Sequence, residues 1–185
     1  MKNPLEFKIK DMSDVFCRQG DFSDGYCVGT INGCDGLYLI CQETQTAKRL
    51  PDEYQETPIY ISPDCGGYRD GLIMVSRMGE MRLAFHHNKY GCAGFWGWID
   101  KDFNNIIEPQ YIFAENFYNG KASVSKGKWI QIDNGQFDWE EESWGIINMQ
   151  GEEIVPCIYD ELNEICDSDN LYLAHKGGWE NGNYC

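Results

Sequence analysis

An internal repeat constrains this chain most strongly, because a sequence that copies one block folds as copies of one structural unit. Residues 94–111, GFWGWIDKDFNNIIEPQY, return at 143–159 as SWGIINMQGEEIVPCIY. Both copies contain a Trp-Gly pair, a short apolar run, a polar turn, two β-branched residues, a proline and a tyrosine. Trp to Tyr spans 15 positions in both copies, whereas Trp to Pro spans 13 in the first and 12 in the second. The sequence therefore predicts the architecture of the protein more directly than its function.

A second landmark, Asp or Asn followed by Gly, recurs along the chain. It lies in FSDGYCV (22–28), YRDGLIMV (68–75) and FYNGKASV (117–124), and Asp169-Asn170 before Leu171 is a worn fourth copy (169–173). The Gly or Asn positions 25, 71, 120 and 170 are 46, 49 and 50 residues apart. Both residue types tolerate a positive φ, as a tight turn between antiparallel strands commonly requires. The pattern predicts repeated β-hairpins.

The segments between these turns read as short strands. Each is rich in β-branched or aromatic residues and is bounded by Gly, Asn, Asp or Pro. Pro109 and Pro156 cannot donate a ladder hydrogen bond, which predicts strand ends, bulges or edges there. A short helix would fit within the diverged stretch 35–56. The predicted strands are 72–76, 80–85, 95–100, 105–111, 122–126, 128–132, 144–148 and 153–159.

The expected fold class is all-β, with antiparallel hairpin quasi-repeats of about 46–50 residues in a curved or propeller-like array. A chain of 185 residues with 42% hydrophobic content is the size of one domain with one good core. We therefore expect residues 1–185 to form a single β domain.

The repeat pattern resembles the bacterial WG repeat, also called the KWG repeat. Two units match well within about 68–160, and the flanking units are diverged. The family's usual unit is shorter, and extra residues lie here before each Trp-Gly pair, for example 126–143. The resemblance implies a non-catalytic β-rich repeat used for binding, without a shared active site. It is carried by Trp96 to Asp100, Ile106-Ile107, Pro109, Tyr111, Phe117, Asn119 to Val124, Trp144 to Ile147, Ile154 to Pro156 and Tyr159-Asp160.

The acidic charge is concentrated in the last third of the chain. The net charge is −15, and residues 133–185 hold 13 Asp or Glu against one Lys, a net of −12. Such a field repels nucleic acid and anionic membranes and attracts basic partners. Without a leader-like segment or a long apolar run, the chain is expected to be cytoplasmic. Nine cysteines in that compartment predict free thiols.

No catalytic motif is present, so we expect no enzyme activity, no metal and no cofactor. A metal site at His86 and His87, with His175 and Cys92, is disfavoured because adjacent strand residues point to opposite faces. A nucleophilic cysteine is disfavoured because carboxylates around Cys157 and Cys166 would raise the thiol pKa. The Trp-Gly pairs are interpreted as core positions.

The remaining candidate site is an acidic, aromatic surface near the C-terminus. For any single acid, a solvated face is the simpler interpretation, but as a set these residues offer charge for approach and a ring for anchoring. The candidate partner-binding residues are Asp138, Trp139, Glu140, Glu141, Glu142, Asp160, Glu161, Glu164, Asp167 and Asp169.

The leading expectation is a non-enzymatic protein-binding module that meets a basic partner. An immunity protein that blocks the cleft of a cognate toxin would fit. One alternative is a carbohydrate-binding protein or hydrolase that uses aromatic and acidic residues in a cleft. Another is a structural repeat scaffold.

Overall fold

The computed structural model describes residues 6–17, 22–55, 67–77, 84–86, 89–91, 94–132, 137–164, 172–177, 179–180 and 183–184. These residues form strands and two short 3-10 turns. In chain order the elements are β1 (Glu6–Lys8), η1 (Met12–Asp14), β2 (Val15–Cys17), β3 (Tyr26–Ile31), β4 (Cys34–Cys41), β5 (Thr46–Arg49), η2 (Asp52–Tyr54), β6 (Tyr68–Arg69), β7 (Leu72–Arg77), β8 (Ala84–His86), β9 (Lys89–Gly91), β10 (Phe95–Asp100), β11 (Asn105–Tyr111), β12 (Phe113–Ala114), β13 (Lys121–Gln131), β14 (Phe137–Asn148), β15 (Glu153–Tyr159), β16 (Glu161–Glu164), β17 (Tyr172–His175), β18 (Trp179–Glu180) and β19 (Asn183–Tyr184).

The quasi-repeat is a three-stranded antiparallel meander that occurs three times. Unit 1 is β3–β4–β5, unit 2 is β7–β10–β11 and unit 3 is β13–β14–β15. Each unit begins after a two-residue turn in which both residues have positive φ: Asp24-Gly25, Asp70-Gly71 and Asn119-Gly120. The prediction that these pairs form tight hairpin turns is confirmed.

Units 2 and 3 share their cross-strand register as well as their sequence. Trp96 lies opposite Tyr111 in unit 2, and Trp144 lies opposite Tyr159 in unit 3. The polar turn after each Trp-Gly strand is also built alike. Asp100 Oδ1 accepts hydrogen bonds from the backbone N–H groups two and four residues later, at 2.8 and 2.9 Å. The equivalent Oδ1 of Asn148 accepts the same pair at 3.0 and 2.9 Å.

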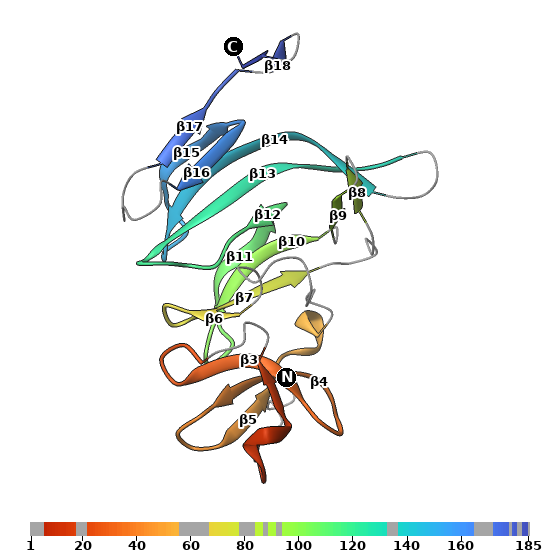
Figure 1. Cartoon of the computed structure of the whole chain (residues 1–185), viewed down its shortest axis with the longest axis vertical. Helices are drawn as coiled ribbons and strands as arrows, with labels where there is room; N and C mark the ends of the chain where they lie inside the picture. Colours follow the sequence, from red (N-terminus) through yellow and green to blue (C-terminus); the bar gives the residue numbers. More distant parts are fainter. Residues whose placement is uncertain are drawn as a thin grey trace.

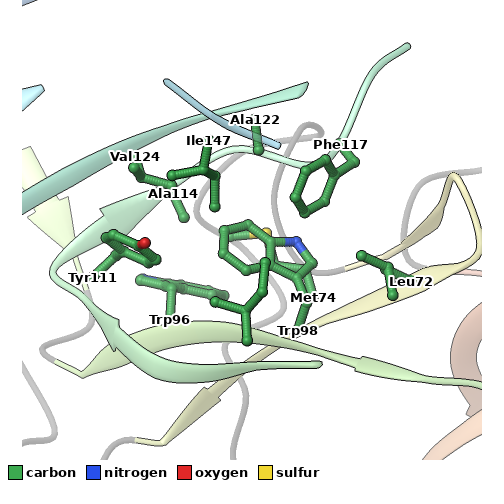
Figure 2. Close-up of a cluster of buried hydrophobic side chains, with 11 residues drawn as sticks. Leu72, Met74, Trp96, Trp98, Tyr111, Ala114, Phe117, Ala122, Val124 and Ile147 are labelled. Atoms are coloured by element: carbon green, nitrogen blue, oxygen red, sulfur yellow. The ribbon is translucent and has the colours of Figure 1, made fainter. Parts of the chain in front are cut away.

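The sheets of the three units stack along the long axis of the molecule (Figure 1). A core between units 2 and 3 packs Trp96, Trp98 and Tyr111 from one sheet against Phe117 and Ile147 from the next. Figure 2 shows the two rows of side chains facing each other.

A second core lies between units 1 and 2. It joins residues of the first sheet to buried residues of the second sheet and its preceding strand, namely Val28, Leu37, Leu39, Leu50, Tyr54, Tyr68, Ile73, Val75 and Ile99. The other face of the first sheet is covered by the N-terminal segment, through Phe7, Ile9, Met12 and Val15. Each inner sheet face is therefore buried by a neighbouring layer.

The arrangement is an open stack in the described part of the chain. The strands there divide among separate sheets, and no closed barrel or propeller is formed. The all-β, antiparallel expectation is confirmed, whereas the propeller-like array has no support in these residues.

Several predicted strand boundaries match the structure and others do not. The strands 95–100, 105–111 and 153–159 are found as predicted. The two strands expected on either side of Gly127 are one strand, β13, with a register shift at that glycine. Strand β14 begins seven residues before the predicted Trp144, at Phe137. Among the described residues of the stretch 35–56, which end at residue 55, the helical turn is η2.

The prolines lie on outer strands, as predicted. Pro109 is in β11 and Pro156 in β15, and each strand is the outer strand of its three-stranded unit. Each proline also lies where the register to the middle strand shifts, so its missing N–H interrupts no regular ladder.

The expectation that every cysteine is a free thiol is wrong for Cys17 and Cys27, which form a disulfide. Their Cα atoms are 5.8 Å apart, within the usual range for a disulfide. The pairing of β2 with β3 brings the two residues together across 10 positions of sequence. Cys34, Cys41 and Cys157 are free. The other four cysteines lie outside the described residues.

Candidate partner-binding surface

Extra residues in units 2 and 3 build a lateral arm. In unit 1 the first two strands are joined by a short turn at Asn32-Gly33. In unit 3 they continue beyond the repeat as residues 127–131 and 137–142, which we call the arm. The extra segment of unit 2 meets it, because Ala84 of β8 pairs with Phe137. The arm is thus the main departure from the regular meander.

A cluster of four aromatic rings connects the arm to the third sheet: Phe113, Trp129, Trp139 and Trp144, called the ring cluster below. Trp129 and Trp139 are directly opposite each other, with ring centroids 5.8 Å apart at 80°. Phe113 contacts Trp139 edge-on at 4.9 Å and stacks with Trp144 at 6.2 Å. All four side chains are half-buried. The spacing between neighbouring rings shows that they pack on one another and form a small aromatic core.

Hydrogen bonds fix both indoles of the arm. The Trp129 Nε1–H donates to the Gly94 carbonyl at 2.8 Å, which joins the arm to the start of β10. The Trp139 Nε1–H donates to Glu142 Oε2 at 2.9 Å. The Ser125 hydroxyl lies 3.4 Å from the other oxygen of Glu142. Glu142 is therefore a structural carboxylate within the ring cluster.

Alternation along β14 points Asp138 and Glu140, two other acids of the arm, to the face opposite Trp139. Of the predicted acids, Glu142 is the one that accepts from the Trp139 indole. Asp138 is half-buried, and its Oδ1 accepts from the Trp139 backbone N–H. Glu140 and Glu141 are exposed, and Glu141 forms an ion pair with Lys128 at 2.5 Å.

The acids that follow β15 are only partly described. Asp160 and Glu161 are exposed. Asp160 Oδ2 accepts from the Gly177 backbone N–H at 2.6 Å, and Glu161 Oε1 accepts from the Asn163 side chain at 3.0 Å. Only the backbone of Glu164 is described, and Asp167 and Asp169 lie outside the described residues.

An ion pair between Lys126 and Glu153 lies next to the half-buried thiol of Cys157. Lys126 Nζ donates to Glu153 Oε1, which lowers the pKa of Glu153 and raises the pKa of Lys126. Burial, and then the charge of Glu153, raise the pKa of the Cys157 thiol to about 11. The direction agrees with the expectation that Cys157 is a poor nucleophile.

Among the described side chains, no group of three or more His, Cys, Asp or Glu is placed to hold a metal ion. The side chains of His86, His87 and Cys92 are outside that description. No helix of the described residues is long and apolar enough to cross a membrane.

The sequence pattern points to Trp139 but not to its neighbours Phe113, Trp129 and Trp144. A partial signal was available, because Asn134-Gly135 is a strong hairpin-turn dipeptide and lies between Trp129 and Trp139. A two-residue turn there would place Trp129 opposite Glu140, whereas the register of the arm pairs it with Trp139, so the dipeptide predicts a hairpin but not this contact. The contacts of Phe113 depend on the pairing of β12 with β13 and have no comparable local signal.

Comparison with known proteins identifies the repeat. The family described as WG containing repeat matches residues 96–128 and 144–178. No curated protein and no solved structure gives a match. The first matched segment runs from β10 into β13 and the second from β14 to just past β17, so each begins at a Trp-Gly strand. The chain therefore carries two units of the WG-repeat family.

Proposed function

We propose that this protein is a non-enzymatic binding module whose acidic C-terminal third docks onto a basic protein. The observation that carries the proposal is the concentration of charge, with a net of −12 in residues 133–185. The WG repeats support it, because stacked repeats present extended surfaces and the lateral arm adds a rigid, acidic projection.

Within the arm, Glu140 and Glu141 are the carboxylates best placed for a partner. Both are exposed, and the Glu141–Lys128 pair is itself largely exposed, with side-chain exposures of 63% and 61%. Exposed ion pairs are worth little, roughly 0–1 kcal/mol, so a partner's cation can replace Lys128 at small cost. Glu142 is held by Trp139 and is excluded from this role.

The finer proposal is a cytoplasmic immunity protein that blocks the cleft of a basic toxin or enzyme. Its carboxylates would take the place of substrate phosphates in that cleft. The support is the charge of the C-terminal third and the lack of a catalytic motif in the sequence.

The test is affinity capture from the native host, followed by calorimetry with the captured protein. The Glu140→Gln, Glu141→Gln double variant is compared with Asp35→Asn, Glu43→Gln, which changes the same charge on exposed residues of unit 1. We expect affinity to fall with added salt and to fall further in the first variant only. A tight complex whose affinity changes neither with added salt nor in the Glu140→Gln, Glu141→Gln variant would contradict the proposal.

A further inference from the structure

The third sheet has a side that is less covered than its counterpart in unit 2. Directly opposite residues on antiparallel strands share a face. Phe113, Ser125, Trp144 and Tyr159 form one such row across β12, β13, β14 and β15. Ser123, Ile146 and Val155 form the next row. This side points away from unit 2, because Val124, between the two serines, is in the core that faces unit 2.

Unit 2 shows what covers such a face when the stack continues. Its equivalent residues Trp96, Trp98, Ile107 and Tyr111 are 3%, 1%, 3% and 2% exposed, because unit 3 packs on them. In unit 3, Ile146 and Ser125 are also buried. The remaining members of its rows include five half-buried residues, called the end face below: Phe113, Ser123, Trp144, Val155 and Tyr159.

After β15 the chain forms a further, two-stranded sheet. β16 pairs with β17 as β12 pairs with β13, which continues the repeat. In the described residues no strand then occupies the place of a middle strand, because β18 and β19 pair only with each other. Middle strands cover the face below, as Ile99 and Ile147 do in the two inter-sheet cores. Among the strands that the structure describes, none therefore takes the place above the end face that a middle strand takes in the two lower layers.

We propose that the end face binds an extended, basic segment of the partner protein in the place of this strand. The proposal rests on the proposed function, since it names where and how the basic partner docks. Each lower face is covered by β-structure, so an extended segment is the complementary shape. A segment that carries an apolar side chain and a lysine or arginine two residues apart has both on one face, and would place the apolar group on Val155 and the cation over Trp144.

Charge selects the basic segment over a second copy of this chain. Asp160 and Glu161 follow Tyr159 directly, and the last third of the chain has a net charge of −12. Two copies that met end face to end face would bring like charges together, which is unfavourable. A cationic segment gains from the same field.

The decisive test uses the full chain and a synthetic peptide that repeats valine-serine-lysine-serine, so that one face of the extended peptide carries both valine and lysine. NMR amide shifts, measured at low salt, map where the peptide binds, and the same peptide with glutamate in place of lysine is the charge control. Ser123→Arg adds bulk and positive charge to the end face, and Gln42→Arg adds the same side chain to an exposed position of unit 1.

We expect the lysine peptide to shift the amides of Trp144, Val155 and Tyr159, and Ser123→Arg to weaken its binding at least roughly tenfold relative to Gln42→Arg. Shifts elsewhere, no binding, equal binding to both variants, or equal binding of the glutamate peptide would overturn the proposal. The mapping on the unsubstituted chain stays decisive if Ser123→Arg lowers stability. If the affinity for a captured basic partner falls in the Glu140 and Glu141 variant but not in Ser123→Arg, the proposed function stands and the end face is excluded as the binding site.

Discussion

Gly97 and Gly145, the glycines that follow the repeat tryptophans, lie where the neighbouring strand comes closest. A Cβ at Gly97 would lie 2.4 Å from the Ile107 carbonyl oxygen and 2.6 Å from the Pro109 nitrogen. At Gly145 it would lie 2.7 Å from the Cys157 nitrogen. These contacts are with backbone, which yields less easily than a side chain. The Trp-Gly signature therefore reflects close strand packing.

Gly97→Ala is expected to destabilise the protein by about 1–3 kcal/mol, because the new methyl group overpacks two strands. Chemical denaturation measures the change. Gly71→Asn is the control, since Gly71 has a positive φ that Asn tolerates and no atom lies within 4 Å of its added Cβ. Equal losses in both variants would show that the close approach is unimportant.

Cys157 gives the folded protein a dependence on alkaline pH. Its folded pKa is about 11, raised from 9.0 chiefly by burial. Below pH 9 the thiol is protonated in both states. Between the two values the unfolded chain loses the proton while the folded chain keeps it, so this contribution to stability falls as pH rises.

We expect the free energy of unfolding to decline more steeply from pH 9 to 11 in the parent chain than in Cys157→Ala. Denaturation curves at several pH values measure both slopes. The tyrosines also titrate in this pH range, but they are present in both chains, so the difference between the slopes reports on Cys157. Parallel slopes would mean that burial of the Cys157 thiol does not affect stability.

The arm shows how far the bounds of single strands can be predicted from the sequence. The apolar runs at 122–126 and 144–148 were recognised as strands because their alternation is local. The continuation of the first run is predicted only as a separate strand, 128–132, since Gly127 reads as a strand boundary, and the continuation of the second run before Trp144 is not predicted as a strand. In the structure Gly127 is where the register shifts, and the rings of Trp129 and Trp139 hold the pair together beyond it.

Trp129→Ala is expected to loosen the arm while the stack stays folded. Loss of one cross-strand ring contact costs about 0.5–1.5 kcal/mol beyond the lost buried area. Hydrogen exchange should speed up at 127–131 and 137–142, and the exciton-coupled circular dichroism of the indole pair should vanish. Lys128→Ala is the control on the opposite face of the arm. Unchanged exchange in Trp129→Ala would show that the ring cluster does not order the arm.

At the scale of the whole molecule, stability comes from cores between successive sheets. Trp98 is 1% exposed between units 2 and 3, and Ile40 is 0% exposed between unit 1 and the N-terminal segment. In such a stack each layer contacts only its neighbours, so damage to one core is felt first by the layers that share it.

Trp98→Ala is expected to cost about 3–5 kcal/mol and Ile40→Ala about 2–5 kcal/mol, each by leaving a cavity. Hydrogen exchange should rise first in β7, β10, β13 and β14 for Trp98→Ala, and in β3, β4 and β5 for Ile40→Ala. Uniform loss of protection in both variants would mean that the stack unfolds as one unit.

The sequence by itself determined the repeating unit of this protein: the turns at Gly25, Gly71 and Gly120, the strands between them and the tryptophan positions. These follow from local backbone preferences and from alternation, which a short stretch contains in full. Only the tertiary structure decided that the sheets stack, that Cys17 meets Cys27 and that Trp139 faces Phe113 while Glu140 points away. Those outcomes depend on strand register and on pairing between distant segments, and a single short segment does not encode its partner.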